Sequence, residues 1–434
     1  MFSVFVQYLF LLSAYPLARW VLPRINSRQK ALVFHITLGV AACSVLYRTR
    51  LLLAIIMIVT GYIILDYNPY YVFAIAYFMN TAVHFVQLVW PINVRVKNLT
   101  KMIFFKIVAT SFNLADGRKV KEGKAGLNKR QKTFHLLKKP TFLEWIGYCF
   151  TPFGAISPSF YEFRLFENIL DVGKNPSKIS DKSRSKAIEC LKRSFVHFVI
   201  YYVFRHFFTL KFYKSEFFLS LNILFRILLV LILGIIVFSR DFMFWKVVDA
   251  SLFEVGFLDS GLVEEDEFTS LTIENLLSQK TIKDWSKAFN HTNEIFWSNY
   301  LTLRGPESGL PPKVIEWIAF FCKPIYKGLC GGILLASFEK KLFVAAEKVL
   351  HTFAPRFTKD TFWPEYIFTQ VFMVLNRASM RFTTVYAFFY VNYVIYFIFW
   401  IVAAAMVGYG YYMEKNEASA PEKKEDDQQH VKKD

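Results

Sequence analysis

The sequence predicts an all-α, multi-pass membrane protein with about eight to eleven transmembrane or re-entrant helices. Three observations carry this prediction. Of the 434 residues, 54% are hydrophobic and 18% are aromatic, and the apolar residues gather in runs separated by Lys and Arg. This composition excludes an ordinary soluble domain. A net charge of +18 would suggest nucleic-acid binding in a soluble chain, but basic residues between apolar runs are typical of membrane-protein loops. We therefore expect a lipid bilayer, and no nucleic acid, as partner.

The first four apolar runs are expected to be membrane helices. Met1–Ala18 lacks the basic start and the small-residue cleavage site of a secretory signal, so we expect a first helix and not a cleaved signal. Ala31–Leu46 and Leu51–Leu65 are short for a perpendicular span of about 20 residues, which favours tilted or re-entrant helices. Pro69–Val89 is a more convincing span.

The cleanest later span is Phe217–Phe238, interrupted only by Arg226. We expect this arginine to have a packing role rather than to contact substrate. Asp241–Leu277 mixes acidic and apolar residues and is expected to be interfacial helix and loop. The remaining apolar segments are Phe195–Leu210, Gly331–Leu350, Glu365–Leu375 and Thr383–Tyr412, the last of which is expected to be one long span.

The polar connections are also predicted from composition. The apolar segment Met102–Phe112 is expected to end at the turn pair Asp116-Gly117. The basic loop that follows, Arg118–Lys139, is expected to face the cytosol, either as a solvated loop without a ligand or against anionic headgroups. A second basic linker is expected at Lys174–Arg193. Residues 1–413 then form the membrane domain, and 414–434 form a disordered polar cytosolic tail.

One stretch stands out because it is polar between apolar segments. Trp285–Phe338 contains a cluster of polar and aromatic residues: Asn290, His291, Thr292, Asn293, Trp297, Tyr300 and Arg304. Polar groups at membrane depth are costly and usually functional. By contrast, the five cysteines, Cys43, Cys149, Cys190, Cys322 and Cys330, lack the paired spacing of a zinc site or a disulfide framework. We expect the chemistry in Trp285–Phe338, without a metal.

Four passages occur in an order that resembles the membrane-bound O-acyltransferase (MBOAT) family, in its lysophospholipid acyltransferase branch. The motif core covers residues 94–346. Phe104–Arg118 is similar to the family's helix ending in Asp-Gly, here Asp116 and Gly117, and Phe142–Tyr161 contains Tyr148, with Ser157-Pro158 in place of Gly-Pro. In the third passage Asn290, Thr292, Trp297, Tyr300 and Arg304 match the family pattern, while Phe289 replaces a Trp.

The fourth passage departs from the family at one position. Where the family has Trp-His-Gly, this chain has Tyr326, Lys327 and Gly328, followed by Gly332. The resemblance implies that Asn290 and Lys327 are the catalytic positions. Burial lowers a lysine's pKa, so a desolvated Lys327 could act as a base, and Lys323, one helical turn earlier, would push in the same direction. The alternatives are His291 as a substitute base, a lysine that anchors in the headgroups, and loss of catalysis.

The resemblance implies an enzyme of phospholipid remodelling in the endoplasmic reticulum membrane. It would transfer a fatty acyl group from acyl-CoA, a co-substrate, to a lysophospholipid, with no cofactor. A tunnel would meet near Asn290 and Lys327, Asn290 would orient the base or stabilise the oxyanion, and Arg304 with the basic loops would hold CoA phosphates. The alternative is a catalytically inactive homologue that binds lipid or acyl-CoA or scaffolds a membrane partner. A transporter is a weaker third reading, since only Arg226 lies within a clean span.

Overall fold

The fold is helical throughout the described part of the chain. The computed structural model describes residues 2–89, 97–124, 126–152, 160–171, 179–265, 269, 273–289, 291–326, 331–353, 363–380, 385–395 and 397–419. Helices make up 84% of the structure, and these residues contain no strand. Three helical stretches among them are long and apolar enough to cross a membrane: Val4–Arg24, Arg28–Ile64 and Ile223–Ser260. The all-α prediction is confirmed.

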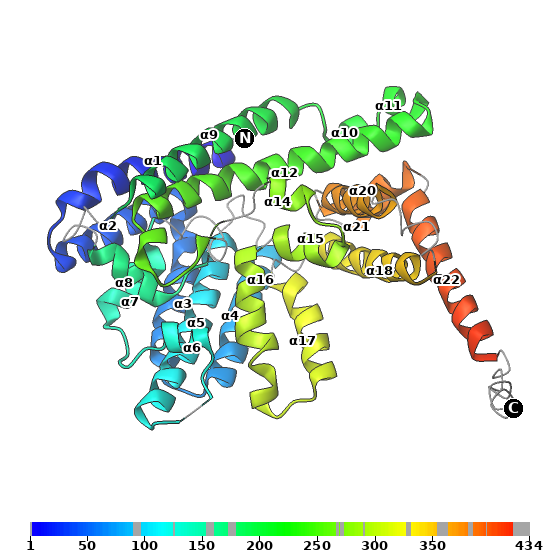
Figure 1. Ribbon diagram of the computed structural model, residues 1–434. Helices are drawn as coiled ribbons and strands as arrows, with labels where there is room; N and C mark the ends of the chain where they lie inside the picture. Colours follow the sequence, from blue (N-terminus) through cyan, green and yellow to red (C-terminus); the bar gives the residue numbers. More distant parts are fainter. Residues whose placement is uncertain are drawn as a thin grey trace, which may run out of the picture.

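The first half of the chain forms one group of packed helices, on the left in Figure 1. They are α1 (Phe2–Pro16), α2 (Arg28–Tyr47), α3 (Leu51–Ile64), α4 (Pro69–Val89), α5 (Lys97–Lys121), α6 (Lys129–Phe134), α7 (Phe142–Phe150), α8 (Phe163–Asp171) and α9 (Asp181–Phe204). The short 3-10 turn Arg48–Arg50 joins α2 to α3 within the helical stretch Arg28–Ile64. Arg48, with φ 51, ends α2, so the two predicted short spans are two helices. Helix α5 lies near the middle of this group and packs against α3, α4 and α7.

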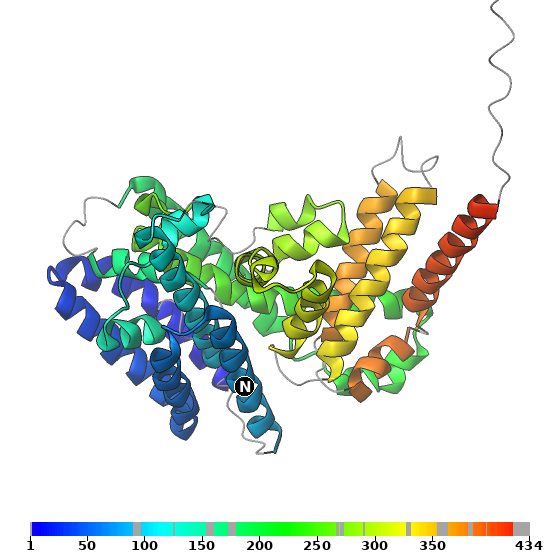
Figure 2. The same ribbon diagram turned by 90° about the horizontal axis from the view of Figure 1, so that it is seen from below.

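The second half of the chain contributes the helices on the right in Figure 1 and a middle segment. They are α10 (Leu210–Tyr213), α11 (Glu216–Ser220), α12 (Ile223–Glu254), α14 (Ile273–Leu277), α15 (Ile282–Phe289), α16 (His291–Trp297), the π-helical turn η7 (Ser298–Thr302), the 3-10 turn η8 (Gly305–Ser308), α17 (Pro312–Ile325), α18 (Gly331–Phe353), α20 (Trp363–Met380), α21 (Val385–Tyr393) and α22 (Ile398–Ser419). Figure 2 shows α18 and α20 side by side, with α22 outside them.

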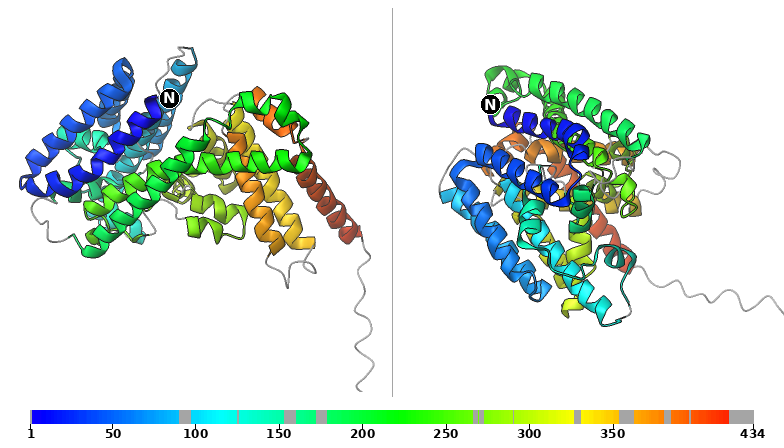
Figure 3. Two further views of the ribbon diagram at one scale, coloured as in Figure 1. Left: turned by 90° about the horizontal axis from the view of Figure 1, so that it is seen from above. Right: turned by 90° about the vertical axis from the view of Figure 1, so that its left-hand side faces the viewer.

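Helix α12 connects the two groups. It lies along α9 and reaches from the first group to α20 of the second, as Figures 1 and 3 both show. Its C-terminal part, with Met243 and Val247, belongs to the hydrophobic core of the first group, and its N-terminal part, with Val230 and Leu233, belongs to the core of the second. The helix begins where the Asn222 side chain accepts the backbone N–H of Phe225, at 3.1 Å.

Helix α12 differs from the predicted span. The predicted span Phe217–Phe238 is interrupted between α11 and α12, and α12 continues beyond Phe238 to Glu254. The first part of Asp241–Leu277, the segment expected to be interfacial helix and loop, is therefore the end of α12, where Lys246 Nζ lies 3.1 Å from Asp249 Oδ2 with both side chains buried. Arg226 donates to the carbonyl oxygens of Leu219, Leu221 and Val394, contacts of the kind that the expected packing role requires.

Other boundaries also differ from the predictions. The long terminal span Thr383–Tyr412 contains two helices, α21 and α22. Phe397 lies between them with φ 51, a left-handed conformation that a right-handed helix cannot contain. Helix α22 extends to Ser419, so the first residues of the predicted tail are helical, and 420–434 lie outside the described residues. The basic loop contains α6, and the second basic linker becomes helical at Asp181, where the Ser180 side chain caps α9.

Candidate functional site

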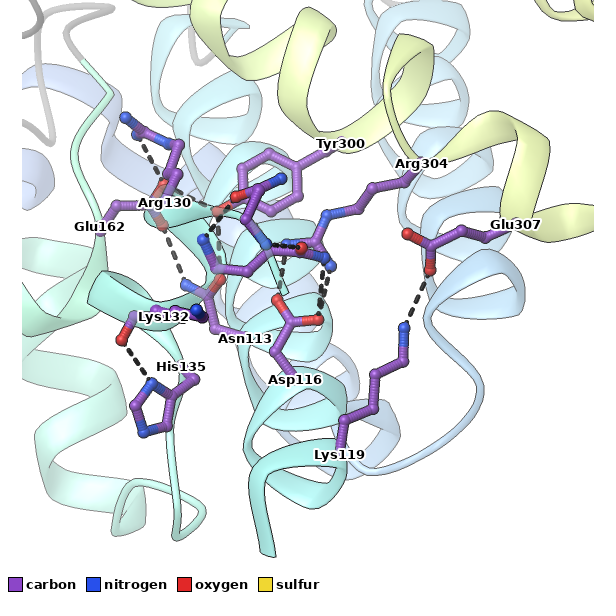
Figure 4. A network of polar contacts seen from close by, with 12 residues as sticks. Asn113, Asp116, Lys119, Arg130, Lys132, His135, Glu162, Tyr300, Arg304 and Glu307 are labelled. Atoms are coloured by element: carbon purple, nitrogen blue, oxygen red, sulfur yellow. Dashed lines mark hydrogen bonds and ion pairs between the residues drawn. The ribbon is translucent and has the colours of Figure 1, made fainter. Parts of the chain in front are cut away.

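Six polar side chains join α5 to the passage that follows α16. We call them the arginine–carboxylate network: Asn113, Asp116, Arg130, Glu162, Tyr300 and Arg304. Figure 4 shows the network with the neighbouring pair Lys119 and Glu307. Tyr300 and Arg304 lie in or just after η7, one turn apart, and both point toward α5. The third and first sequence passages therefore meet here, although 188 residues separate Asp116 from Arg304.

The Asp116–Arg304 pair is the strongest contact of the network. The guanidinium donates from Nη1 to Asp116 Oδ1 at 3.0 Å and from Nη2 to Oδ2 at 2.6 Å, which is a two-point contact. Asp116 is fully buried and Arg304 is 6% exposed. The Arg304 guanidinium also lies 4.8 Å from the ring centre of Phe112. We expected Arg304 to hold a CoA phosphate; in the structure its guanidinium is paired with the Asp116 carboxylate.

Glu162 forms the other half of the network. Its carboxylate accepts from Arg130 Nη2 at 3.0 Å, from the Tyr300 hydroxyl at 2.7 Å and from Asn113 Nδ2 at 3.0 Å. Burial, and then the adjacent Glu162 carboxylate, raise the pKa of Tyr300 well above its usual value, so the phenol remains a donor. Two carboxylates thus meet two guanidinium groups. The network acts as a structural clamp between α5 and η7.

The prediction that α5 ends at Asp116-Gly117 is wrong. The helix continues to Lys121, and the glycine serves close packing: a Cβ there would lie 1.9 Å from the Leu136 carbonyl oxygen. That approach brings the segment after α6 against α5, where the Leu136 N–H donates to the Asn113 carbonyl at 2.9 Å. A continuous α5 is what places Asn113 and Asp116 on one face, one turn apart.

Tyr148, predicted as a motif residue, contacts the buried Lys106. Lys106 Nζ donates to the Tyr148 carbonyl oxygen at 2.5 Å and lies 4.5 Å from the centre of the Tyr148 ring and 5.2 Å from that of Tyr161. Lys106 is fully buried, and the Tyr148 hydroxyl donates to the Tyr161 carbonyl at 2.5 Å. Ring faces and carbonyl oxygens both stabilise a cation. Sequence analysis did not single out Lys106.

A second group, which we call the Tyr326 cluster, consists of Asn80, His84, Phe105, Trp297 and Tyr326. The Tyr326 ring centre lies 5.1 Å from that of Trp297 and 5.4 Å from that of Phe105. Its backbone carbonyl accepts from His84 Nε2 at 2.9 Å and from Asn80 Nδ2 at 3.2 Å. All five residues are buried. The structure thus brings the third and fourth passages together and adds two polar side chains from α4.

The other predicted site residues have mixed outcomes. Asn290, Lys327, Gly328 and Pro158 lie outside the described residues. His291 begins α16 and is partly buried, next to the buried Thr292. Gly332 is buried in the first turn of α18. Lys323 Nζ lies 2.6 Å from Glu294 Oε2, so a carboxylate offsets the positive charge that we expected to act on Lys327.

The residues that sequence analysis missed left weak signals. Asn113 precedes Asp116 by three residues and Asn80 precedes His84 by four, spacings that place each pair on one helix face. Glu162 directly follows the second passage. Among the described residues no group of His, Cys, Asp and Glu could hold a metal ion, and the four described cysteines are free thiols.

Comparisons with known proteins add no assignment: no protein-family model matches the chain, and no curated protein matches it. The function has to be argued from the residues and their arrangement.

Proposed function

We propose that the chain is a membrane O-acyltransferase of the MBOAT type, which transfers a fatty acyl group from acyl-CoA to a lysophospholipid in the endoplasmic reticulum membrane. The observation that carries the proposal is that three of the motif passages meet in space. Trp297 of the third packs on Tyr326 of the fourth, with ring centres 5.1 Å apart, and Arg304 of the third pairs with Asp116 of the first. Passages up to 188 residues apart in the sequence thus pack together in the buried part of the fold, as the parts of one reaction site would have to.

Acyl transfer needs a base for the acceptor hydroxyl and a hydrogen-bond donor for the thioester oxygen. The acceptor hydroxyl attacks the thioester carbonyl, a base takes the hydroxyl proton, and the CoA thiolate leaves and receives that proton. Asn290, one residue before α16, is the proposed oxyanion donor. Lys327 occupies the position of the family's histidine and is the first residue to test as base. The exposed basic residues at and after the end of α5, among them Lys121 and Lys124, would attract CoA phosphates.

A second function is favoured by one specific observation, the lysine at position 327. Lysine has a reference pKa of about 10.4, so it is charged in water and is a poor replacement for histidine as a base. A chain that kept its fold and lost only this residue would bind lipid or acyl-CoA without turning it over. The two functions predict opposite effects when the histidine is restored.

The test measures acyl transfer from labelled acyl-CoA to a panel of lysophospholipids, in membranes that contain the native chain, Asn290→Ala or Lys327→His. The control is Lys313→Ala, which removes an exposed lysine at the start of α17. Transfer by the native chain and the control, with a loss of about 100-fold or more in Asn290→Ala, supports the enzyme. Background transfer by the native chain, with activity gained in Lys327→His, supports the binding protein.

A further inference from the structure

Helix α17 presents a row of exposed apolar side chains. Leu310, just before the helix, is followed by Val314, Trp317 and Phe321 at spacings of four, three and four residues, which place the four side chains on one face. Their exposed fractions lie between 42% and 56%. Another side of the helix meets the protein, since Ile315 is only 3% exposed. A continuous exposed apolar surface of this kind marks a site of interaction.

The row continues into further aromatic side chains. The ring centre of Phe320 lies 5.1 Å from that of Phe321 and 5.3 Å from that of Phe338, an exposed residue of α18. Lys341 Nζ lies 3.6 Å from the ring centre of Phe320 and 4.6 Å from that of Trp317. Aromatic rings with a lysine ammonium over them are apolar below and charged above, a composition typical of the boundary between acyl chains and headgroups. We call the apolar set the α17 face: Leu310, Val314, Trp317, Phe320, Phe321 and Phe338.

The α17 face belongs to a part of the molecule whose helices suit a membrane. The Tyr77 hydroxyl of α4 donates to the Cys322 carbonyl oxygen of α17 at 3.4 Å, and α4 packs against α3, which lies in a stretch apolar enough to cross a membrane. Helix α3 exposes Ile56 and Ile63, and α4 exposes Phe78. Figure 1 shows α17 as one arm of a hairpin with α16. Three linked helices thus leave apolar side chains uncovered, and lipid covers such side chains in a membrane protein.

Helix α17 is unsuited to crossing the bilayer itself. Its 14 residues span about 21 Å, whereas the hydrocarbon core is about 30 Å thick. The helix also carries three charged residues, Lys313, Glu316 and Lys323. A helix with one apolar face and charged residues elsewhere lies in the boundary region, with the apolar face about 5–10 Å deep.

We propose that the α17 face is seated in the glycerol and upper acyl-chain region of one bilayer leaflet, with Lys341 directed toward the lipid phosphates. Lipid fits this face better than a second copy of the chain. A protein contact over the rings would bury the Lys341 ammonium, which is costly, whereas in the boundary region the ammonium keeps its contact with water and phosphate. The inference goes beyond acyl transfer and requires only that the chain lies in a membrane.

The experiment uses the full chain in phosphatidylcholine vesicles that contain a trace of photoreactive lipid. The lipid carries a diazirine on its acyl chain, either near the glycerol end or at the terminal methyl group, and mass spectrometry identifies the labelled peptides. The peptide of α3 with Ile56 and Ile63 is the internal positive control. The polar first half of α9, with the exposed Lys182 and Glu189, is the internal negative control.

The expected result is that the probe near the glycerol labels α17 about threefold or more above the terminal probe, because the face lies about 5–10 Å deep and the terminal methyl groups lie near the middle of the core. Both probes should label α3, and neither should label the first half of α9. Val314→Glu places a charge on the face and should lower the labelling of α17 about fivefold or more, whereas Glu316→Gln, outside the face, should keep it within about twofold.

The other outcomes overturn the inference. Equal labelling of α17 by the two probes would place the face in the hydrocarbon core. An unlabelled α17 beside a labelled α3 would show that water or protein covers the face, and cross-linking between copies through α17 would identify a second copy as the occupant. An unlabelled α3 would remove the membrane that the inference requires. Loss of the proposed acyl transfer would leave the labelling unchanged, so the two proposals fail separately.

Discussion

The arginine–carboxylate network and the Tyr326 cluster both hold the passage around Trp297 and Tyr300, but they use polar groups differently. In the network, the charged side chains bind one another: Asp116 with Arg304, and Glu162 with Arg130. In the cluster, the side chains of His84 and Asn80 bind a backbone carbonyl. In the network, the charged groups are paired with one another and hold α5 against η7. In the cluster, an imidazole and an amide hold the backbone at the end of α17. The same passage is thus held by ion pairs at one end and by neutral hydrogen bonds at the other.

The largest effect is expected from removing one partner of the buried ion pair. Arg304→Met keeps most of the side-chain volume and leaves the Asp116 carboxylate buried without its cation. We expect a loss of about 3–5 kcal/mol in the free energy of unfolding, measured by equilibrium unfolding in mixed micelles. Adding Asp116→Asn to this variant should recover part of the loss. If Arg304→Met unfolds like the native chain, the network is not the clamp that we describe.

The next largest effect tests the close approach at Gly117. Gly117→Ala would place a Cβ 1.9 Å from the Leu136 carbonyl oxygen, so backbone has to move. The expected loss is about 3 kcal/mol, measured in the same way. The matched control is Gly408→Ala in α22, where a Cβ meets no atom within 4 Å; it should be neutral or stabilising by up to about 1 kcal/mol. Equal stabilities of the two variants would show that α5 and the Leu136 segment are not in tight contact.

A smaller effect distinguishes charged from neutral acceptors. Tyr300→Phe removes the 2.7 Å hydrogen bond to the Glu162 carboxylate, and Tyr70→Phe removes one of equal length to the Arg304 backbone carbonyl. Hydrogen bonds to charged groups contribute about 1.5–3 kcal/mol and neutral ones about 0.5–1.5. Tyr300→Phe should therefore destabilise more than Tyr70→Phe in the unfolding experiment. The reverse order would contradict the role of Glu162 as the centre of the network.

The smallest effect concerns the ion pair at the edge of the same interface. Lys119 and Glu307 join α5 to η8 at 3.0 Å, with side chains about 40% exposed (38% and 44%). Exposed pairs contribute about 0–1 kcal/mol and are screened by salt. Glu307→Gln should change the unfolding free energy by less than about 1 kcal/mol, and by less again at high salt. A loss as large as that of Arg304→Met would mean that burial is not what separates the two pairs.

The sequence predicts the helices well and their ends poorly. The apolar runs predicted the ends of α4, α18 and α20 to within five residues. They did so because a helix that buries an apolar surface needs a run of apolar residues in the sequence. Gly117 was interpreted as a turn residue because glycine is used both for turns and for close packing, and only the position of Leu136 decides between them. The break at Phe397 has no glycine or proline to mark it.

The candidate site shows the same limit. Tyr300, Arg304 and Asp116 were found from their motif pattern, and the structure brings them together. Glu162, the partner of Tyr300, and His84, which contacts Tyr326, lie 138 and 242 residues away from these motif positions in the sequence. Such pairings depend on how helices pack, and no local spacing encodes them.

The long separation between Asp116 and Arg304 has a consequence for how the chain is made. A ribosome adds about 5–20 residues per second, so the 188 residues between them take roughly 10–40 seconds to synthesise. During that interval α5 and the Gln131 side chain, whose Nε2 lies 3.4 Å from Asp116 Oδ1 in the finished fold, are present without the arginine. Until Arg304 is synthesised, the Asp116 carboxylate lacks the cation that it pairs with in the finished fold. The contact that joins α5 to η7 can therefore form only late in the synthesis of the chain.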